Sequence, residues 1–217
     1  MDPAETPRAT VAIHAPARAF APGTQTAMVR LGYRLVTAET AARHTEDGDP
    51  CQPAIRIVDD RRLESIPLES NGNGIPLILL TGHRGPLARD SRAVGAVRRR
   101  ARVNELFVLL QRALEPWPRT VPRVPAALPA RCTRGNHGWA AAIGSISEKG
   151  CFLLSTERLE PEERLDVCFA LPREGLMQVP AQPSYVSGKR AGLVFRDTSE
   201  QSRSAIADYV NTQLTAP

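Results

Sequence analysis

The sequence has few aromatic residues and lacks long apolar runs, and each shortage excludes something. Phe, Trp and Tyr make up 5% of the 217 residues, so we expect cores built mainly from aliphatic side chains and alanine. No apolar run approaches the ~20 residues needed to cross a bilayer. The first ten residues carry prolines and acids where a signal peptide has an apolar stretch. These absences favour a soluble, cytoplasmic protein without membrane insertion.

Paired cysteines and clustered histidines are also lacking. No CxxC pair is present, which disfavours a zinc site or a disulfide framework. We interpret Cys151 and Cys168, which fall in apolar runs, as small hydrophobic residues. The histidines at 44, 83 and 137 are isolated in loop-like sequence, and no nucleophile lies near a base. We therefore expect no metal, no cofactor and no enzymatic activity. The cysteines are Cys51, Cys132, Cys151 and Cys168.

Lysine is rare in a chain whose net charge is nevertheless +5, and only Lys149 and Lys189 contribute it. The charge favours anionic partners weakly. The densest basic run, residues 98–102 (RRRAR), has no interleaved aromatic residue for base stacking. We interpret it as a solvated loop leading into a helix. Nucleic acid is thus a disfavoured partner, and DNA binding stays a distant alternative without a clear helix-turn-helix pattern.

Short apolar runs alternate with helical patterns in the first half of the chain, after a tail at residues 1–8. Gly32 can terminate the first helix. The run at residues 75–80 is almost uniformly apolar, which is typical of a strand buried on both faces. This alternation predicts an α/β domain with a doubly wound parallel sheet over residues 9–115. The expected strands are residues 10–14, 33–36, 55–58 and 75–80, and the expected helices are residues 27–31, 39–43 and 103–114.

The character of the chain changes at residue 115, where five prolines within fifteen residues form a semi-rigid linker. Beyond it the apolar pattern has a period of two, as at residues 165–171 and 193–195. Short alternating strands joined by turns predict an antiparallel β-barrel over residues 116–217. The chain closes with a helix, for which Thr198 and Gln201 form a capping box. Its apolar face is Ile206, Tyr209, Val210 and Leu214.

Two local motifs of the second half carry chemistry. Arg119 and Arg123 lie four residues apart in a proline-rich segment before the first strand, and a Ser-x-Ser-x-x-Gly turn follows at Ser145, Ser147 and Gly150. Together they resemble the PilZ family, which carries RxxxR before the first strand and [D/N]xSxxG at a following turn. Residues 122–125 (PRVP) and 192–195 (GLVF) extend the resemblance to about 100 residues.

The resemblance implies that cyclic di-GMP is the ligand, often bound as a stacked dimer. Arginine can clamp phosphate oxygens, reach a guanine edge and stack on a base. Ser147 would offer a hydroxyl, and Gly150 would allow positive φ and close backbone approach. The family's Asp or Asn is Ser145 here, a weaker acceptor. The leading reading is therefore a cyclic di-GMP-responsive signalling adaptor for an unidentified protein partner, and the alternative is a PilZ-like scaffold that has lost the nucleotide.

The first half resembles a receiver domain of response regulators, in a degenerate form. Asp59 ends the third strand, where the phosphoacceptor would lie, and Thr81 ends the fourth. The acidic pair that would hold magnesium is replaced by His14 and Ala15, and the family's lysine has no equivalent. We interpret Asp59 and Asp60 as solvated carboxylates. This predicts a pseudo-receiver that binds proteins or forms a homodimer, and a regulator phosphorylated at Asp59 is a third reading.

Overall fold

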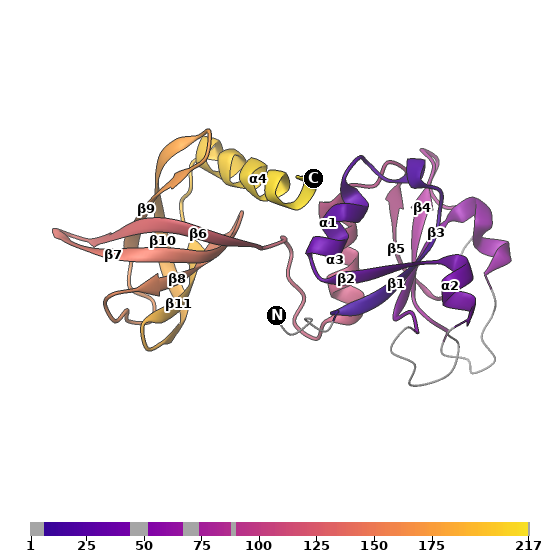
Figure 1. Ribbon diagram of the computed structural model, residues 1–217, viewed down its shortest axis with the longest axis horizontal. Coiled ribbons are helices and arrows are strands. Elements are labelled where there is room, and N and C mark those ends of the chain that lie inside the picture. The colour runs from indigo at the N-terminus through magenta and orange to yellow at the C-terminus, as the bar shows by residue number, and fades with distance from the viewer. Residues whose placement is uncertain (1–6, 44–51, 67–73, 88–89, 217) are drawn as a thin grey trace, which may run out of the picture. The chain divides into compact units, whose positions relative to one another are not determined.

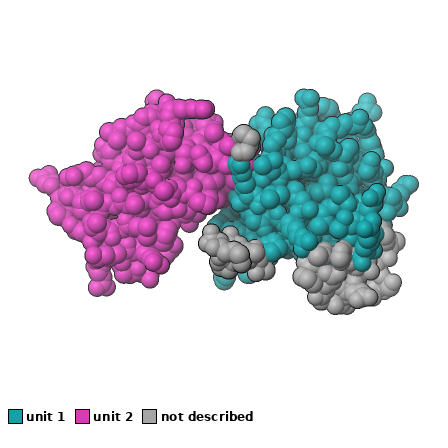
Figure 2. Space-filling model, viewed as in Figure 1, with its two compact units in different colours: residues 1–120 teal, residues 121–217 magenta. Residues whose placement is uncertain are grey.

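The computed structural model describes residues 7–43, 52–66, 74–87 and 90–216. The chain divides into two compact units, residues 1–120 and residues 121–217, which Figure 2 distinguishes by colour. The predicted loop at residues 44–53, including His44 and Cys51, lies mostly outside the described residues. None of the described helices is long and apolar enough to span a bilayer.

The first unit is built on a parallel sheet, as the alternating pattern predicts (Figure 1). The sheet has five strands, and the pattern predicted four of them but not β5. The strand order is β2-β1-β3-β4-β5, one of the two common orders of doubly wound sheets. Every residue of β3 and β4 is buried, and burial on both faces explains the almost uniformly apolar sequence of β4. The strands are β1 (Ala9–His14), β2 (Tyr33–Thr37), β3 (Ile55–Asp59), β4 (Leu77–Thr81) and β5 (Ala93–Arg98).

Helices cover the two faces of this sheet. The helices α1 (Thr24–Arg30) and α3 (Val103–Leu114) contact each other, and α2 (Ala38–Arg43) packs against β1 and β2 on the opposite face (Figure 1). Gly32 follows the C-cap of α1 with φ of 90°, as expected for a helix-terminating glycine. Between β3 and β4 the described residues form only the 3-10 helix η2 (Asp60–Ser65), and those between β4 and β5 form no helix.

The second unit is a closed antiparallel barrel of six strands, in the order β10-β11-β8-β7-β6-β9. This confirms the barrel predicted from the period-two pattern. Inward-facing side chains such as Val167, Phe169 and Leu193 are buried, while residues between them are more exposed. The strands are β6 (Val124–Arg134), β7 (His137–Ser147), β8 (Gly150–Ser155), β9 (Leu165–Leu171), β10 (Gly175–Ser187) and β11 (Arg190–Phe195).

The helix α4 (Glu200–Thr215) ends the chain and contacts β6 and β7, which confirms the predicted closing helix. Ile206, Val210 and Leu214 are buried, as its apolar periodicity requires. The predicted cap is wrong by one residue. Ser199 is the N-cap, and its hydroxyl accepts a hydrogen bond of 3.1 Å from the backbone N–H of Ser202.

Candidate functional site

The register of the barrel brings one arginine of the RxxxR motif to the serine–glycine turn. Val124 of β6 pairs with Ile146 of β7, so the preceding residue, Arg123, lies beside Ser147 at the same end of the barrel. Burial raises the pKa of the Cys151 thiol to about 12, Cys132 adds to this, and the charge of Arg123 acts in the opposite direction. The arginine is therefore close enough to influence a residue just past the turn.

Arg119 is exposed, and its backbone is held within the first unit. Its N–H donates a hydrogen bond of 3.2 Å to Oε1 of Gln111, a side chain on α3 that is only 2% exposed. The amide nitrogen of Gln111 donates in turn to the Tyr33 hydroxyl at 3.1 Å. The buried amide thus ties the start of the linker to α3 and β2. Arg119 and Arg123 stand on either side of the division between the units.

Ser147 and Gly150 shape the turn itself. Ser147 is 4% exposed, and its hydroxyl donates a hydrogen bond of 3.0 Å to the carbonyl oxygen of Gly150, so it closes the turn between β7 and β8. The expected positive φ at Gly150 is wrong, because Gly150 is not one of the glycines that have a positive φ. A Cβ at Gly150 would lie 2.0 Å from the carbonyl oxygen of Leu193. Glycine is needed here because the backbone of β11 approaches β8.

Ser145 begins a row of residues that crosses the outer surface of the barrel. It pairs with Phe152 of β8, which pairs with Gly192 of β11, which pairs with Tyr185 of β10. The residues next to them along the strands, such as Ile146 and Leu153, point inward and are buried. The row therefore faces outward.

Tyr185 gives this outer row an aromatic surface. Its ring lies across Gly192, because a Cβ at that glycine would come within 2.0 Å of Cε1 of the ring. Tyr185 is 50% exposed and Phe152 is partly exposed. The sequence motifs do not reveal these two residues. The alternation of β8 could have placed Phe152 outside, but a bulge in β10 next to Tyr185 disturbs the simple period of two.

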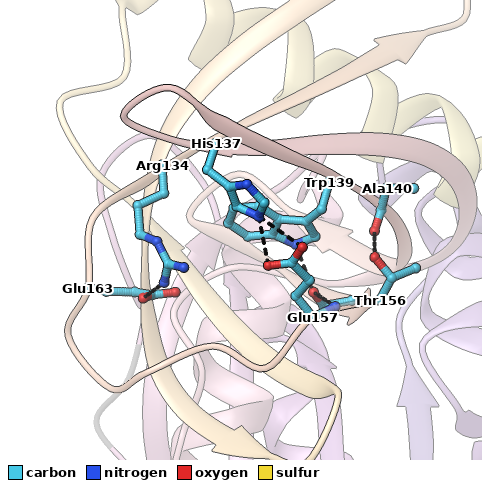
Figure 3. Close-up of polar contacts among 8 residues, drawn as sticks. Arg134, His137, Trp139, Ala140, Thr156, Glu157 and Glu163 are labelled. Atoms are coloured by element: carbon cyan, nitrogen blue, oxygen red, sulfur yellow. Dashed lines mark hydrogen bonds and ion pairs between the residues drawn. The ribbon is translucent and has the colours of Figure 1, made fainter.

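The opposite end of β7 carries a polar cluster, drawn in Figure 3. Nε2 of His137 lies 2.9 Å from a carboxylate oxygen of Glu157, and the imidazole stacks on Trp139. The indole N–H of Trp139 donates to the Ser155 hydroxyl at 2.9 Å, and the guanidinium of Arg134 lies over the indole. The expectation that His137 is isolated in a loop is wrong. These contacts join β7 to the segment after β8 and explain the histidine structurally.

In the first unit, Asp59 and Asp60 are buried, at 4% and 5% exposure, so the prediction of solvated carboxylates is wrong. Arg99, just after β5, binds Asp59 through two hydrogen bonds, from Nη2 to Oδ1 at 2.7 Å and from Nε to Oδ2 at 3.1 Å. Its Nη2 also donates to Asp60. These hydrogen bonds hold the pKa of Asp59 below its ordinary value, against the opposing effect of burial.

The basic run is therefore not one solvated loop. Arg98 is the last residue of β5, Arg99 is paired with both aspartates, and α3 begins only at Val103. Thr81 ends β4 as expected and donates a weak hydrogen bond of 3.4 Å to the carbonyl oxygen of Val97.

His14, which replaces an expected acid, has a pKa lowered to about 4 by burial and by the charges of Arg56 and Arg62. It is neutral at pH 7 and contributes no charge beside the aspartates. Within the described residues no group of three or more His, Cys, Asp or Glu side chains could hold a metal ion.

Residues 118–212 match the model of the PilZ domain family, so this part of the chain is a PilZ domain. Three solved structures are similar to part of this chain at low identity. The Bacillus subtilis inhibitor of motility MotI/DgrA is 19% identical, with a TM-score of 0.41, over 46% of this chain and 53% of that one. The PilZ domain of Escherichia coli YcgR with c-di-GMP is 16% identical, with a TM-score of 0.39, over 45% of this chain and 92% of that one.

The PlzA protein of Borreliella burgdorferi in complex with c-di-GMP is 16% identical, with a TM-score of 0.34, over 50% of this chain and 47% of that one. The matched region thus spans about half the length of MotI/DgrA and of PlzA. No curated protein matches the chain.

Proposed function

We propose that the PilZ domain binds cyclic di-GMP and that the chain relays this signal, as an adaptor without enzymatic activity, to a protein partner. The observation that carries the proposal is the register of β6 and β7. It sets Arg123, the second arginine of the RxxxR motif, beside the turn that bears Ser145 and Ser147. Two motifs 22 residues apart in the sequence, from Arg123 to Ser145, thus share one end of the barrel.

The chemistry of this end suits a cyclic dinucleotide. Arg123 supplies a guanidinium that can clamp phosphodiester oxygens and guanine edges, and Arg119, four residues earlier in the chain, is the other arginine of the proposed site. Ser145 faces outward with a hydroxyl that can accept from a guanine N–H. The neighbouring row of Phe152 and Tyr185 offers an aromatic surface for a base, and stacking of one base contributes about 1–3 kcal/mol. Two stacked ligand molecules would engage both arginines and this surface.

A second candidate function is a protein-interaction scaffold that has lost the nucleotide. Two observations favour it. Ser145 offers a shorter and weaker acceptor than the carboxylate or amide that the family carries there. Ser147 is buried, and its hydroxyl already donates a hydrogen bond to the carbonyl oxygen of Gly150, so the hydroxyl contributes less to binding a ligand. Under this reading the outward aromatic row would meet a protein instead of a base.

The first unit would supply the output as a pseudo-receiver. Its parallel sheet has the order 2-1-3-4-5, and Asp59 lies at the end of β3, where a phosphoacceptor would be expected. Arg99 already binds both oxygens of Asp59, and His14 and Ala15 provide no carboxylate for magnesium. These features support a role in binding proteins, and they weigh against the reading of a regulator phosphorylated at Asp59.

Calorimetric titration of the full chain with cyclic di-GMP tests the proposal. Fluorescence gives a second readout, because Trp117 is 88% exposed two residues before Arg119, whereas Trp139 is 5% exposed. We expect measurable but modest binding, accompanied by a change in emission that disappears in Trp117→Phe.

Arg119→Ala combined with Arg123→Ala should weaken binding at least 100-fold, since each arginine makes charge-assisted hydrogen bonds of about 1.5–3 kcal/mol. The matched control is Arg164→Ala, an exposed arginine in the same unit. The absence of heat at high micromolar ligand would contradict nucleotide binding. Binding that persists in the double variant would contradict the site.

A further inference from the structure

A pocket of about 910 Å³ opens in the first unit, at the carboxyl edge of the parallel sheet. It is formed by the connection from β1 to α1, the first turn of α1, and the connection from β5 to α3. Backbone hydrogen bonds hold them together. Arg100 N–H donates to the Ala19 carbonyl at 2.8 Å, and Ala21 N–H donates to the Ala101 carbonyl at 2.9 Å. The Thr24 hydroxyl adds a third bond of 3.1 Å, also to the Ala101 carbonyl. The pocket walls are thereby tied into the fold.

Three arginines line this pocket: Arg18 from the first connection, and Arg100 and Arg102 from the second. No acidic side chain is among the described lining residues. None of the three arginines forms an ion pair with a residue that the structure describes. By contrast, the adjacent Arg99 is fully engaged by Asp59 and Asp60. The pocket therefore concentrates positive charge that the described part of the protein does not neutralise.

The backbone conformation of Arg100 divides the basic run between the ion pair of Arg99 and the pocket. Its φ of 64° lies in the left-handed region, which a non-glycine residue rarely adopts. The change of direction lets Arg99 reach the buried aspartates while Arg100 lines the pocket. Strained residues of this kind concentrate at binding sites and switches. The N-terminus of α3 follows directly, where the Glu105 carboxylate accepts a hydrogen bond of 3.0 Å from the backbone N–H of Arg102 and leaves the Arg102 guanidinium without an ion pair among the described residues.

The size and lining of the pocket indicate the class of ligand. A volume near 910 Å³ falls within the ~300–1,000 Å³ typical of small-molecule sites and is too large for a lone phosphate. The walls also include apolar surface from Phe20 and Pro22. In open α/β sheets, ligands bind outside the carboxyl ends of the strands. We propose that this pocket binds a small phosphorylated ligand of nucleotide size, with its phosphates held by Arg18, Arg100 and Arg102.

The probes for this proposal are ATP, GTP and inorganic pyrophosphate, titrated calorimetrically into the full chain at low salt. The variants are chosen to preserve the backbone. Arg18→Gln removes one charge, Arg100→Asn suits the left-handed conformation, and Arg102→Ser places a favourable residue at the N-cap of α3. The matched control is Arg34→Gln, an exposed arginine on β2 that does not line the pocket.

We expect at least one probe to bind, and each pocket variant to weaken that binding about 10-fold or more. Arg34→Gln and the double variant Arg119→Ala/Arg123→Ala should bind the probe as the native protein does, which separates this site from the PilZ domain. The proposal is overturned if no probe binds or if the pocket variants bind normally. It is also overturned if a short DNA duplex binds in preference to all three probes and loses affinity in the same variants. That result would assign a nucleic-acid surface.

Discussion

Gly150 is a residue whose lack of a side chain is decisive for the barrel. The Leu193 carbonyl oxygen lies 2.0 Å from where a Cβ would be, and a backbone atom in the neighbouring strand cannot move aside cheaply. We expect Gly150→Ala to lower the free energy of unfolding by about 1–3 kcal/mol or more, measured by urea denaturation.

Gly138→Ala in β7 is the control for Gly150→Ala. There a Cβ would meet only the guanidinium end of Arg131, which can swing away. Equal stability of the two variants would contradict the account of the close approach between β8 and β11.

Ser145 is the residue at which the two functional readings separate. If the site still holds the family's geometry, Ser145→Asp restores a strong acceptor at the guanine edge. Affinity for cyclic di-GMP should then rise about 10-fold or more, because one good base contact is worth ~1–3 kcal/mol. The measurement is a pair of titrations in the same buffer, since contacts between arginine and phosphate depend on salt. Unchanged or lower affinity would favour the scaffold.

At the scale of elements, the ion pair of Arg99 with Asp59 and Asp60 joins the ends of β3 and β5 across the intervening β4. Arg99→Gln leaves two carboxylates buried without their cation. We expect the unfolding free energy at pH 7 to fall by about 3 kcal/mol, in line with the loss of one partner of a buried pair. Arg98→Gln, at the exposed end of β5, is the matched control and should be near neutral.

The pH dependence of stability gives this ion pair a second test. In the native protein the pKa of Asp59 is lowered on folding, chiefly by its hydrogen bonds to Arg99. Its contribution to stability is therefore present above the ordinary carboxyl pKa and is lost as the pH falls through the lowered value. In Arg99→Gln the largest of these effects is lost, while the backbone N–H of Arg61 still donates to the carboxylate. The variant should therefore lose less stability than the native protein as the pH falls below the ordinary carboxyl pKa, and an equal loss in the two proteins would contradict the assignment.

At the scale of the whole molecule, the signal should enter through the PilZ domain and not through Asp59. Both oxygens of that carboxylate accept hydrogen bonds from Arg99, and His14 and Ala15 replace the acids that would hold magnesium. Beryllofluoride with Mg²⁺ should therefore leave the circular dichroism, the Trp117 emission and the affinity for cyclic di-GMP unchanged. A spectral change that is absent in Asp59→Asn would show a working phosphoacceptor.

Sequence patterns alone determined the classes of both units. Uniform apolar runs alternating with helices predicted the parallel sheet, and a period of two beyond the proline-rich linker predicted the barrel. These predictions succeed because a strand buried on both faces has apolar residues at nearly every position, whereas a strand buried on one face has them at every second position. The arginine and serine–glycine motifs likewise lie within short segments, and they indicated the PilZ domain that the family model identifies.

Only the tertiary structure decided how charges and close contacts are used. Arg99 meets Asp59 across 40 residues, whereas Arg100, its direct neighbour, lines a different site. Gly150 is needed by a strand more than 40 residues away, and Tyr185 reaches the row that begins at Ser145 through three strand pairings. Contacts of this kind depend on strand register and on which loops meet at the edge of a sheet. The local pattern of apolar residues contains no information on register or on loop contacts, so these contacts are determined only by the assembled fold.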